Sequence, residues 1–79
     1  MKVQVLGPGC PKCRQLEANT KEALRLLGIS DPVEKVSDIR EIMKLGVMMT
    51  PALAIDGKVV LSGKAASPAE IQSAITSAL

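Results

Sequence analysis

The sequence contains no phenylalanine, tyrosine or tryptophan, although hydrophobic residues make up 47% of its 79 positions. A hydrophobic core must therefore be built from aliphatic side chains and methionine. The lack of aromatic residues also removes the platforms on which many proteins stack single-stranded nucleic-acid bases. The ten basic residues are scattered and the net charge is only +2, so no phosphate-binding stripe is visible. We expect no nucleic-acid partner.

Histidine is absent and cysteine occurs only twice, so one chain lacks the nitrogen and sulfur ligands of a closed structural zinc site. We expect no resident metal and no other cofactor. Two neighbouring cysteines form no framework of structural disulfides, which favours a reducing compartment, the cytoplasm. No apolar run is long enough for a signal-peptide core or a membrane span. We expect a monomer without a membrane partner, folded as a single domain over residues 1–79.

Both cysteines lie in the stretch from Gly7 to Cys13, between an apolar run and an amphipathic one. If these runs form a strand and a helix, Cys10 lies at the amino terminus of the helix and Cys13 one turn into it. This spacing allows a bond between the two sulfurs, and Pro11 suits the first helical position. Free N–H groups and the helix dipole favour a thiolate at Cys10. Cys13, shielded by packing of the helix on the sheet, should be the less reactive thiol.

Three uses of two cysteines at this spacing are open from the residues alone. A structural disulfide closing so short a loop would add little stability, because the entropic gain grows with loop length. A half-site for a soft metal would need further ligands from a partner or a second copy. A redox-active dithiol needs only the two thiols and the helix terminus, and this is the interpretation that the pattern favours.

Hydrophobic periodicity and turn signals predict seven elements. Gly28 is placed to end the first helix, and the sequences that begin at Asp38 and Ser67 have the form of capping boxes for two more. Asp56-Gly57 is a strong hairpin signal between the last two strands. The expected order is strand 3–6, helix 11–27, strand 32–36, helix 39–45, strand 52–55, strand 58–61 and helix 68–79.

These elements predict an α/β fold with the order βαβαββα, in which three helices cover a four-stranded mixed sheet. The two early strand–helix units imply parallel pairing through right-handed crossovers, and the hairpin adds an antiparallel edge. The two cysteines follow the first strand at its carboxyl end, which is where α/β folds place their functional sites.

With this order and these motifs, the chain resembles the thioredoxin fold, and more closely the small thioredoxin-like redox-active disulfide proteins of bacteria and archaea. The matching stretches are 7–13 with its Cys-Pro-Lys-Cys motif, 48–53 around Thr50-Pro51, and 55–59. The resemblance covers nearly all of the chain. It implies that Cys10 is the attacking thiol, that Cys13 is the resolving thiol, and that Pro51 is a cis-proline facing them.

The sequence departs from its better-known relatives at four places. Gly9 stands where thioredoxins have a tryptophan, and Lys12 stands where glutaredoxins usually have a tyrosine. Gln4, which cannot titrate, replaces the buried aspartate that assists proton transfer in thioredoxins. Ser62-Gly63 replaces the Gly-Gly pair with which glutaredoxins help to hold glutathione.

The resemblance implies a thiol–disulfide oxidoreductase that forms a mixed disulfide between Cys10 and its substrate. The substrate would be a disulfide-containing protein or a small thiol compound, and a thioredoxin-reductase-like protein would supply electrons. We expect Thr50 to pair with an extended substrate beside Pro51, Lys12 and Met49. Of Met48 and Met49, one should point inward and the other outward. The alternative is a redox sensor, or a carrier of copper, zinc or arsenic, that uses the same two thiolates.

Overall fold

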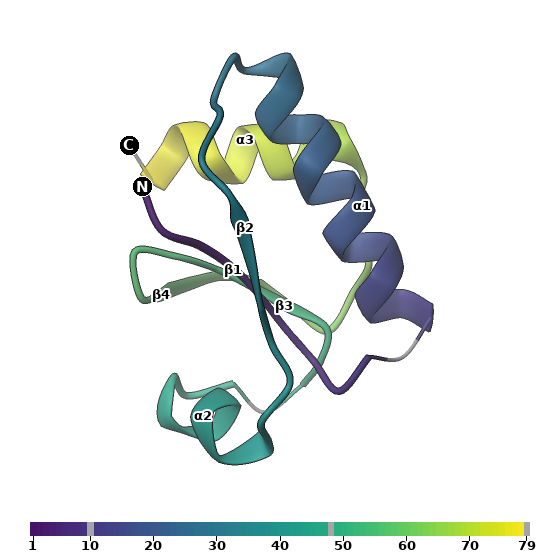
Figure 1. Cartoon of the computed structure of the whole chain (residues 1–79), viewed down its shortest axis with the longest axis vertical. Coiled ribbons are helices and arrows are strands. Elements are labelled where there is room, and N and C mark those ends of the chain that lie inside the picture. Colours follow the sequence, from purple (N-terminus) through teal and green to yellow (C-terminus); the bar gives the residue numbers. More distant parts are fainter. Residues whose placement is uncertain (10, 48, 79) are drawn as a thin grey trace.

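The computed structural model describes residues 1–9, 11–47 and 49–78. The predicted order and the mixed sheet with three helices are confirmed, and each described element boundary lies within one residue of its predicted position. Figure 1 shows the elements, which are β1 (Val3–Leu6), α1 (Pro11–Leu26), β2 (Val33–Val36), α2 (Ile39–Lys44), β3 (Ala52–Ile55), β4 (Lys58–Ser62) and α3 (Pro68–Ala78).

The four strands lie in the order β2-β1-β3-β4. β1 pairs in parallel with β2, with Val3 opposite Val33, and antiparallel with β3, with Val3 opposite Ile55. β3 and β4 form the predicted antiparallel hairpin. Its turn residues, Asp56 and Gly57, both have positive φ angles of 51° and 82°, the conformation that favours Asp-Gly in tight hairpins.

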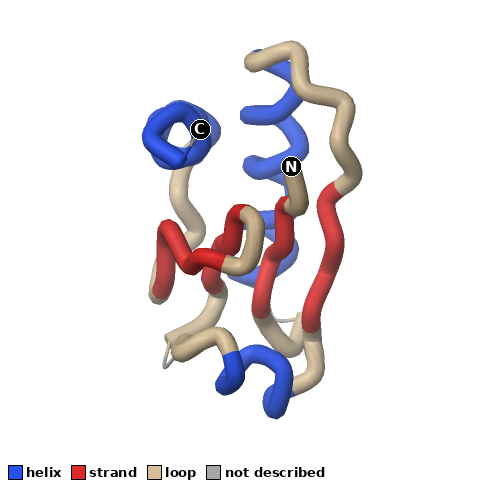
Figure 2. Tube along the Cα trace, turned by 90° about the vertical axis from the view of Figure 1, so that its left-hand side faces the viewer, coloured by secondary structure: helices blue, strands red, loops and turns tan. Residues whose placement is uncertain are grey.

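Parallel pairing is found in only the first of the two early strand–helix units, so the prediction for the second unit is wrong. β3 runs antiparallel to β1. The reason is the place of α2, which lies beside the carboxyl ends of β1 and β2 (Figures 1 and 2). The chain therefore enters β3 from that same end and runs back. A parallel β3 would have required a crossover along the whole length of the sheet.

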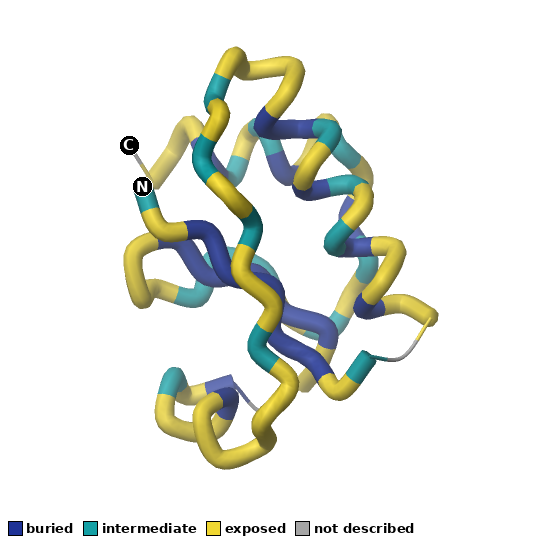
Figure 3. The backbone as a smooth tube through the Cα atoms, viewed as in Figure 1, coloured by how far each residue is buried: buried dark blue, intermediate teal, exposed yellow. Residues whose placement is uncertain are grey.

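Alternation along the two central strands divides the core into two layers, and Figure 3 shows these strands buried between the helices. The larger layer lies between the sheet and helices α1 and α3, and its buried side chains are Val3, Val5, Leu16, Ala23, Leu24, Leu53, Ile55, Ala66, Ile71 and Ile75. The smaller layer, on the α2 side, consists of Leu6, Ile42, Val47, Ala52 and Ala54.

The predicted end of α1 at Gly28 is confirmed. Gly28 has a φ of +72°, and its N–H donates to the carbonyl of Arg25 at 3.1 Å. The N–H of Ile29 donates to the carbonyl of Leu24 at 2.9 Å. These two bonds are those of a Schellman motif, which satisfies carbonyl groups at the end of the helix.

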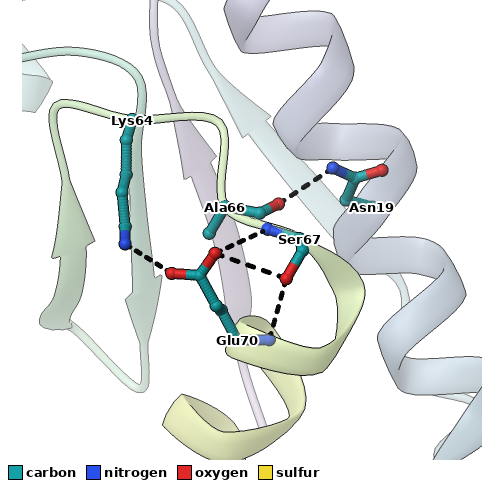
Figure 4. Close-up of polar contacts among 5 residues, drawn as sticks. All are labelled: Asn19, Lys64, Ala66, Ser67 and Glu70. Atoms are coloured by element: carbon teal, nitrogen blue, oxygen red, sulfur yellow. Dashed lines mark hydrogen bonds and ion pairs between the residues drawn. The ribbon is translucent and has the colours of Figure 1, made fainter.

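Of the two predicted capping boxes, the one at α3 is complete (Figure 4). Ser67 Oγ accepts a bond from the Glu70 N–H, and a Glu70 carboxylate oxygen accepts one from the Ser67 N–H, each at 3.3 Å. At α2 the Asp38 carboxylate accepts from the Arg40 N–H at 2.8 Å, which is a simple amino-terminal cap. The Glu41 carboxylate, which a full box would turn toward Asp38, contacts Lys44 Nζ at 3.3 Å.

Asn19 joins α1 to the loop that leads into α3. Its Nδ2 donates to the carbonyl of Ala66 at 2.8 Å (Figure 4). In the same loop Lys64 donates to the Glu70 carboxylate. This bond, the backbone bond from Ser67 and the Lys64 charge lower the pKa of Glu70 below its ordinary value of 4.5. The loop between β4 and α3 is thus tied to both of its neighbouring helices.

Candidate active site

The chain turns from β1 toward α1 through Gly7, Pro8 and Gly9. Gly7 is buried, and its N–H donates to the carbonyl of Val36 at 2.8 Å, which extends the pairing of β1 with β2 by one residue. Gly9 has a φ of +92°, a left-handed conformation that glycine adopts without steric cost. Cys10 lies outside the described residues, so its role as the attacking thiol stays a prediction.

Cys13 lies in the first turn of α1 and is almost fully buried, with 1% of its surface exposed. Its sulfur rests against Gly7. A Cβ atom placed on Gly7 would be 2.3 Å from Cys13 Sγ and 3.9 Å from Pro51 Cα. The fold therefore brings Cys13 and Pro51, which are far apart in the sequence, together at the end of β1.

The peptide bond between Thr50 and Pro51 is cis. Pro51 is fully buried, and its carbonyl accepts a bond from the N–H of Gly63 at 2.8 Å, so the pairing of the hairpin begins at this residue. Thr50, in contrast, is exposed. Thr50 is consequently a surface residue joined directly to the buried proline that adjoins Cys13.

Met49 and Lys12, the other two residues predicted for the binding surface, are both exposed. Met49 is 64% exposed and its side chain covers Gly63, where an added Cβ would be 3.3 Å from Met49 Cε. Met49 therefore points outward, whereas Met48 lies outside the described residues. Lys12 lies in the first turn of α1, and this turn, described from Pro11 onward, contains no acidic side chain. The helix dipole and Lys12 together make this end of α1 electropositive.

An apolar groove of about 370 Å³ extends from Thr50 along α2. It is lined by Ile39, Ile42, Met43, Val47 and Thr50. Ile39 and Met43 are 57% and 66% exposed, although their spacing with Ile42 predicts a face that packs on the core. The groove was not foreseen from the sequence, because apolar residues at helical spacing indicate a buried face more readily than an exposed one.

Gln4 is buried, but it lies on the α2 side of the sheet, whereas Cys13 lies on the α1 side. Alternation along β1 places Gln4 on the side of Leu6, opposite the valine side chains that pack against α1. Its Nε2 donates to a Glu34 carboxylate oxygen at 3.5 Å. Gln4 therefore supplies no proton-transfer group to the site.

Within residues 1–9, 11–47 and 49–78, no three or more histidine, cysteine, aspartate or glutamate side chains are grouped so that they could hold a metal ion. Over the same part of the chain, every helix is too short or too polar to cross a membrane.

Residues 1–76 match the family model described as the thioredoxin domain. The chain belongs to the thioredoxin family. A thioredoxin from Methanothermobacter thermautotrophicus is 40% identical over 72 residues, which cover 91% of this chain and 94% of that protein. A thioredoxin from Methanocaldococcus jannaschii is 40% identical over 77 residues, which cover 98% of this chain and 88% of that protein. This membership identifies the chain as a thioredoxin-like redox protein and supports activity as a disulfide oxidoreductase.

Proposed function

We propose that this thioredoxin-family protein reduces disulfide bonds in other proteins, with Cys10 as the attacking thiol and Cys13 as the resolving thiol. The observation that carries the proposal is the meeting of Cys13 and the cis-proline Pro51 at Gly7. A buried thiol near Pro51, the residue that follows the exposed Thr50, suits a two-step exchange. The substrate is held at the surface while the sulfur behind it completes the reaction.

The reaction consists of two consecutive thiol–disulfide exchanges. The Cys10 thiolate attacks one sulfur of the substrate disulfide, whose S–S bond breaks, and the other substrate sulfur leaves and takes a proton from water. Cys13 then gives its proton to water and attacks the Cys10 sulfur. The mixed disulfide breaks, the second substrate thiol leaves, and a Cys10–Cys13 disulfide forms. Two electrons have passed to the substrate. A reductase of the thioredoxin-reductase class then supplies two electrons to the protein and reduces the Cys10–Cys13 disulfide back to two thiols.

The electrostatics of the helix terminus support the first step. The amino terminus of α1 and the neighbouring Lys12 favour the thiolate form of a cysteine at position 10. The chain has no histidine, and Gln4 lies on the opposite face of the sheet. Proton transfer therefore falls to water and to the substrate.

A polypeptide substrate fits the surface around this site better than a small charged disulfide. We propose that an extended segment of the substrate pairs with the backbone of Thr50, as an added strand does. Met49 and the groove along α2 extend this surface with exposed apolar side chains, among them Met43. Ser62 stands where a glutathione-binding glycine would be expected, which also favours protein disulfides over glutathione.

The proposed setting is a monomer working in a reducing compartment such as the cytoplasm. It rests on the sequence, because two cysteines in one CxxC motif are the whole thiol content of the chain. A dithiol of this kind needs no partner subunit to complete the exchange.

The two cysteine variants test the proposal. With a disulfide-bonded protein as substrate, Cys13→Ser should accumulate a covalent mixed disulfide, because no second thiol resolves it. Cys10→Ser should form such adducts far more slowly. Mass spectrometry and non-reducing gels measure both, and the oxidised wild type should be a monomer that has lost two hydrogens. Equal adduct formation by the two variants would contradict the assigned roles, and tight binding of Cu(I) or Zn(II) without electron transfer would favour the metal-carrier alternative.

A further inference from the structure

Gly7 differs from every other glycine of this chain in its backbone conformation. It does not have a positive φ, so an alanine could adopt its conformation. The remaining five of the six glycines have positive φ angles, and they are Gly9, Gly28, Gly46, Gly57 and Gly63. Any cost of a side chain at position 7 must therefore come from the space around it.

That space is occupied by Cys13. An added Cβ on Gly7 would lie 2.3 Å from Cys13 Sγ and 3.2 Å from Cys13 Cβ. Non-bonded contacts have their optimum at about 3.5 Å or more, so the sulfur would have to move away by about 1.2 Å. Neither group can move easily. The Cys13 side chain is packed in the core with 1% of its surface exposed, and the Gly7 backbone is held by the bond from its N–H to the Val36 carbonyl.

We infer that Gly7 is a positioning residue for the second exchange step: its missing side chain fixes how deeply the Cys13 sulfur lies beside Pro51. This inference rests on the proposed role of Cys13 as the resolving thiol. In that step the Cys13 sulfur must approach the mixed disulfide in line with the bond that breaks. A misplacement of about 1 Å can lower such a rate about 100-fold. The first step, which involves Cys10 and the substrate, does not depend on this contact.

Gly7→Ala tests the inference with a small aromatic disulfide whose thiolates absorb visible light. Dilute reduced protein releases one thiolate when Cys10 attacks and the other when Cys13 resolves, so one trace times both steps. In Gly7→Ala the first release should stay within about twofold of the wild type, and the second should slow by about 10- to 100-fold. The mixed disulfide should accumulate between the two phases, where mass spectrometry can detect it.

Two controls separate positioning from a loss of stability. Gly28→Ala adds the same methyl group at the far end of α1, where a φ of +72° strains the backbone and nothing lies within 4 Å. It should slow neither step. Combining Gly7→Ala with Cys13→Ala removes the sulfur and leaves only the milder 3.2 Å contact with the Cβ atom of residue 13. Gly7→Ala should therefore destabilise the Cys13→Ala protein less than it destabilises the wild type, and the double variant should fold even if Gly7→Ala by itself does not.

Equal slowing of both steps, an unchanged second release, or equal destabilisation by Gly7→Ala with and without the Cys13 sulfur would each overturn the inference. A wild-type protein that releases no thiolate would instead overturn the proposed function. The two failures are therefore distinguishable.

Discussion

Replacing Met43 by serine should slow the reduction of protein disulfides and leave the reduction of small disulfides unchanged. Met43 lines the groove that begins at Thr50. Full burial of a methionine side chain contributes about 1.5–3 kcal/mol, so covering the 66% that is exposed contributes at most about 1–2 kcal/mol. Because about 1.4 kcal/mol corresponds to a factor of ten, kcat/KM for a protein substrate should fall by no more than about 5- to 30-fold.

The assay compares kcat/KM for a disulfide-bonded protein and for a small aromatic disulfide in parallel. The small disulfide should react at the wild-type rate, because it does not need to cover α2. Leu26→Ser is the matched control, since Leu26 is 51% exposed in the last turn of α1, outside the groove, and should leave both rates unchanged. Equal losses on both substrates, or an equal loss in Leu26→Ser, would refute the docking role of the groove.

Stability must be measured beside activity, because an unfolded variant would also lose turnover. The chain has no aromatic residue, so far-ultraviolet circular dichroism is the suitable probe of unfolding. Met43 is 66% and Leu26 is 51% exposed, so their serine variants give up only the buried remainder and should each lose about 0.5–1.5 kcal/mol.

Two further predictions concern the way α3 is held. Asn19→Ala removes the donor to the carbonyl of the buried Ala66, which costs about 1–3 kcal/mol, or about 4–8 °C in Tm for each kcal/mol. Gln15→Ala, which removes the exposed bond to the same asparagine, should change the Tm little, and an equal effect would contradict the reasoning. Glu70→Gln should destabilise the protein at neutral pH and not in acid, because Lys64 and Ser67 lower the pKa of Glu70 below 4.5 in the folded state. That stabilisation is present above the ordinary value and is lost as the pH falls through the folded-state pKa. The unfolding midpoints of Glu70→Gln and the wild type should converge between pH 7 and pH 3. A difference that persists at pH 3 would contradict a stabilising role for the Glu70 charge.

The elements and their ends could be predicted because their signals are local. The motif at Gly28, the capping box from Ser67 to Glu70 and the hairpin at Asp56-Gly57 each depend on residues within a few positions of one another. Such signals need no tertiary contact, so the ends of these elements can be predicted from the sequence alone. The position of the two cysteines after the first strand follows from the same local patterns.

The features that were missed all depend on contacts between distant residues. The direction of β3 is decided by where α2 lies, which no local pattern specifies. Gly7 resembles an ordinary end of a strand, and its contact with Cys13 arises only after α1 packs on the sheet. Ile39 and Met43 have the spacing of a buried face, but α2 is less than two turns long and buries Ile42 alone among its residues.

The two sides of the sheet differ in how much free energy is needed to open them. β3 presents the small side chains Ala52 and Ala54 toward α2, and the large Leu53 and Ile55 toward α1 and α3. Detaching α2 therefore exposes little apolar surface, and hydrogen exchange in α2 should report a smaller opening free energy than in α1. We therefore expect the surface proposed for substrates around Thr50 to adjust to different sequences while the packing that holds Cys13 stays closed.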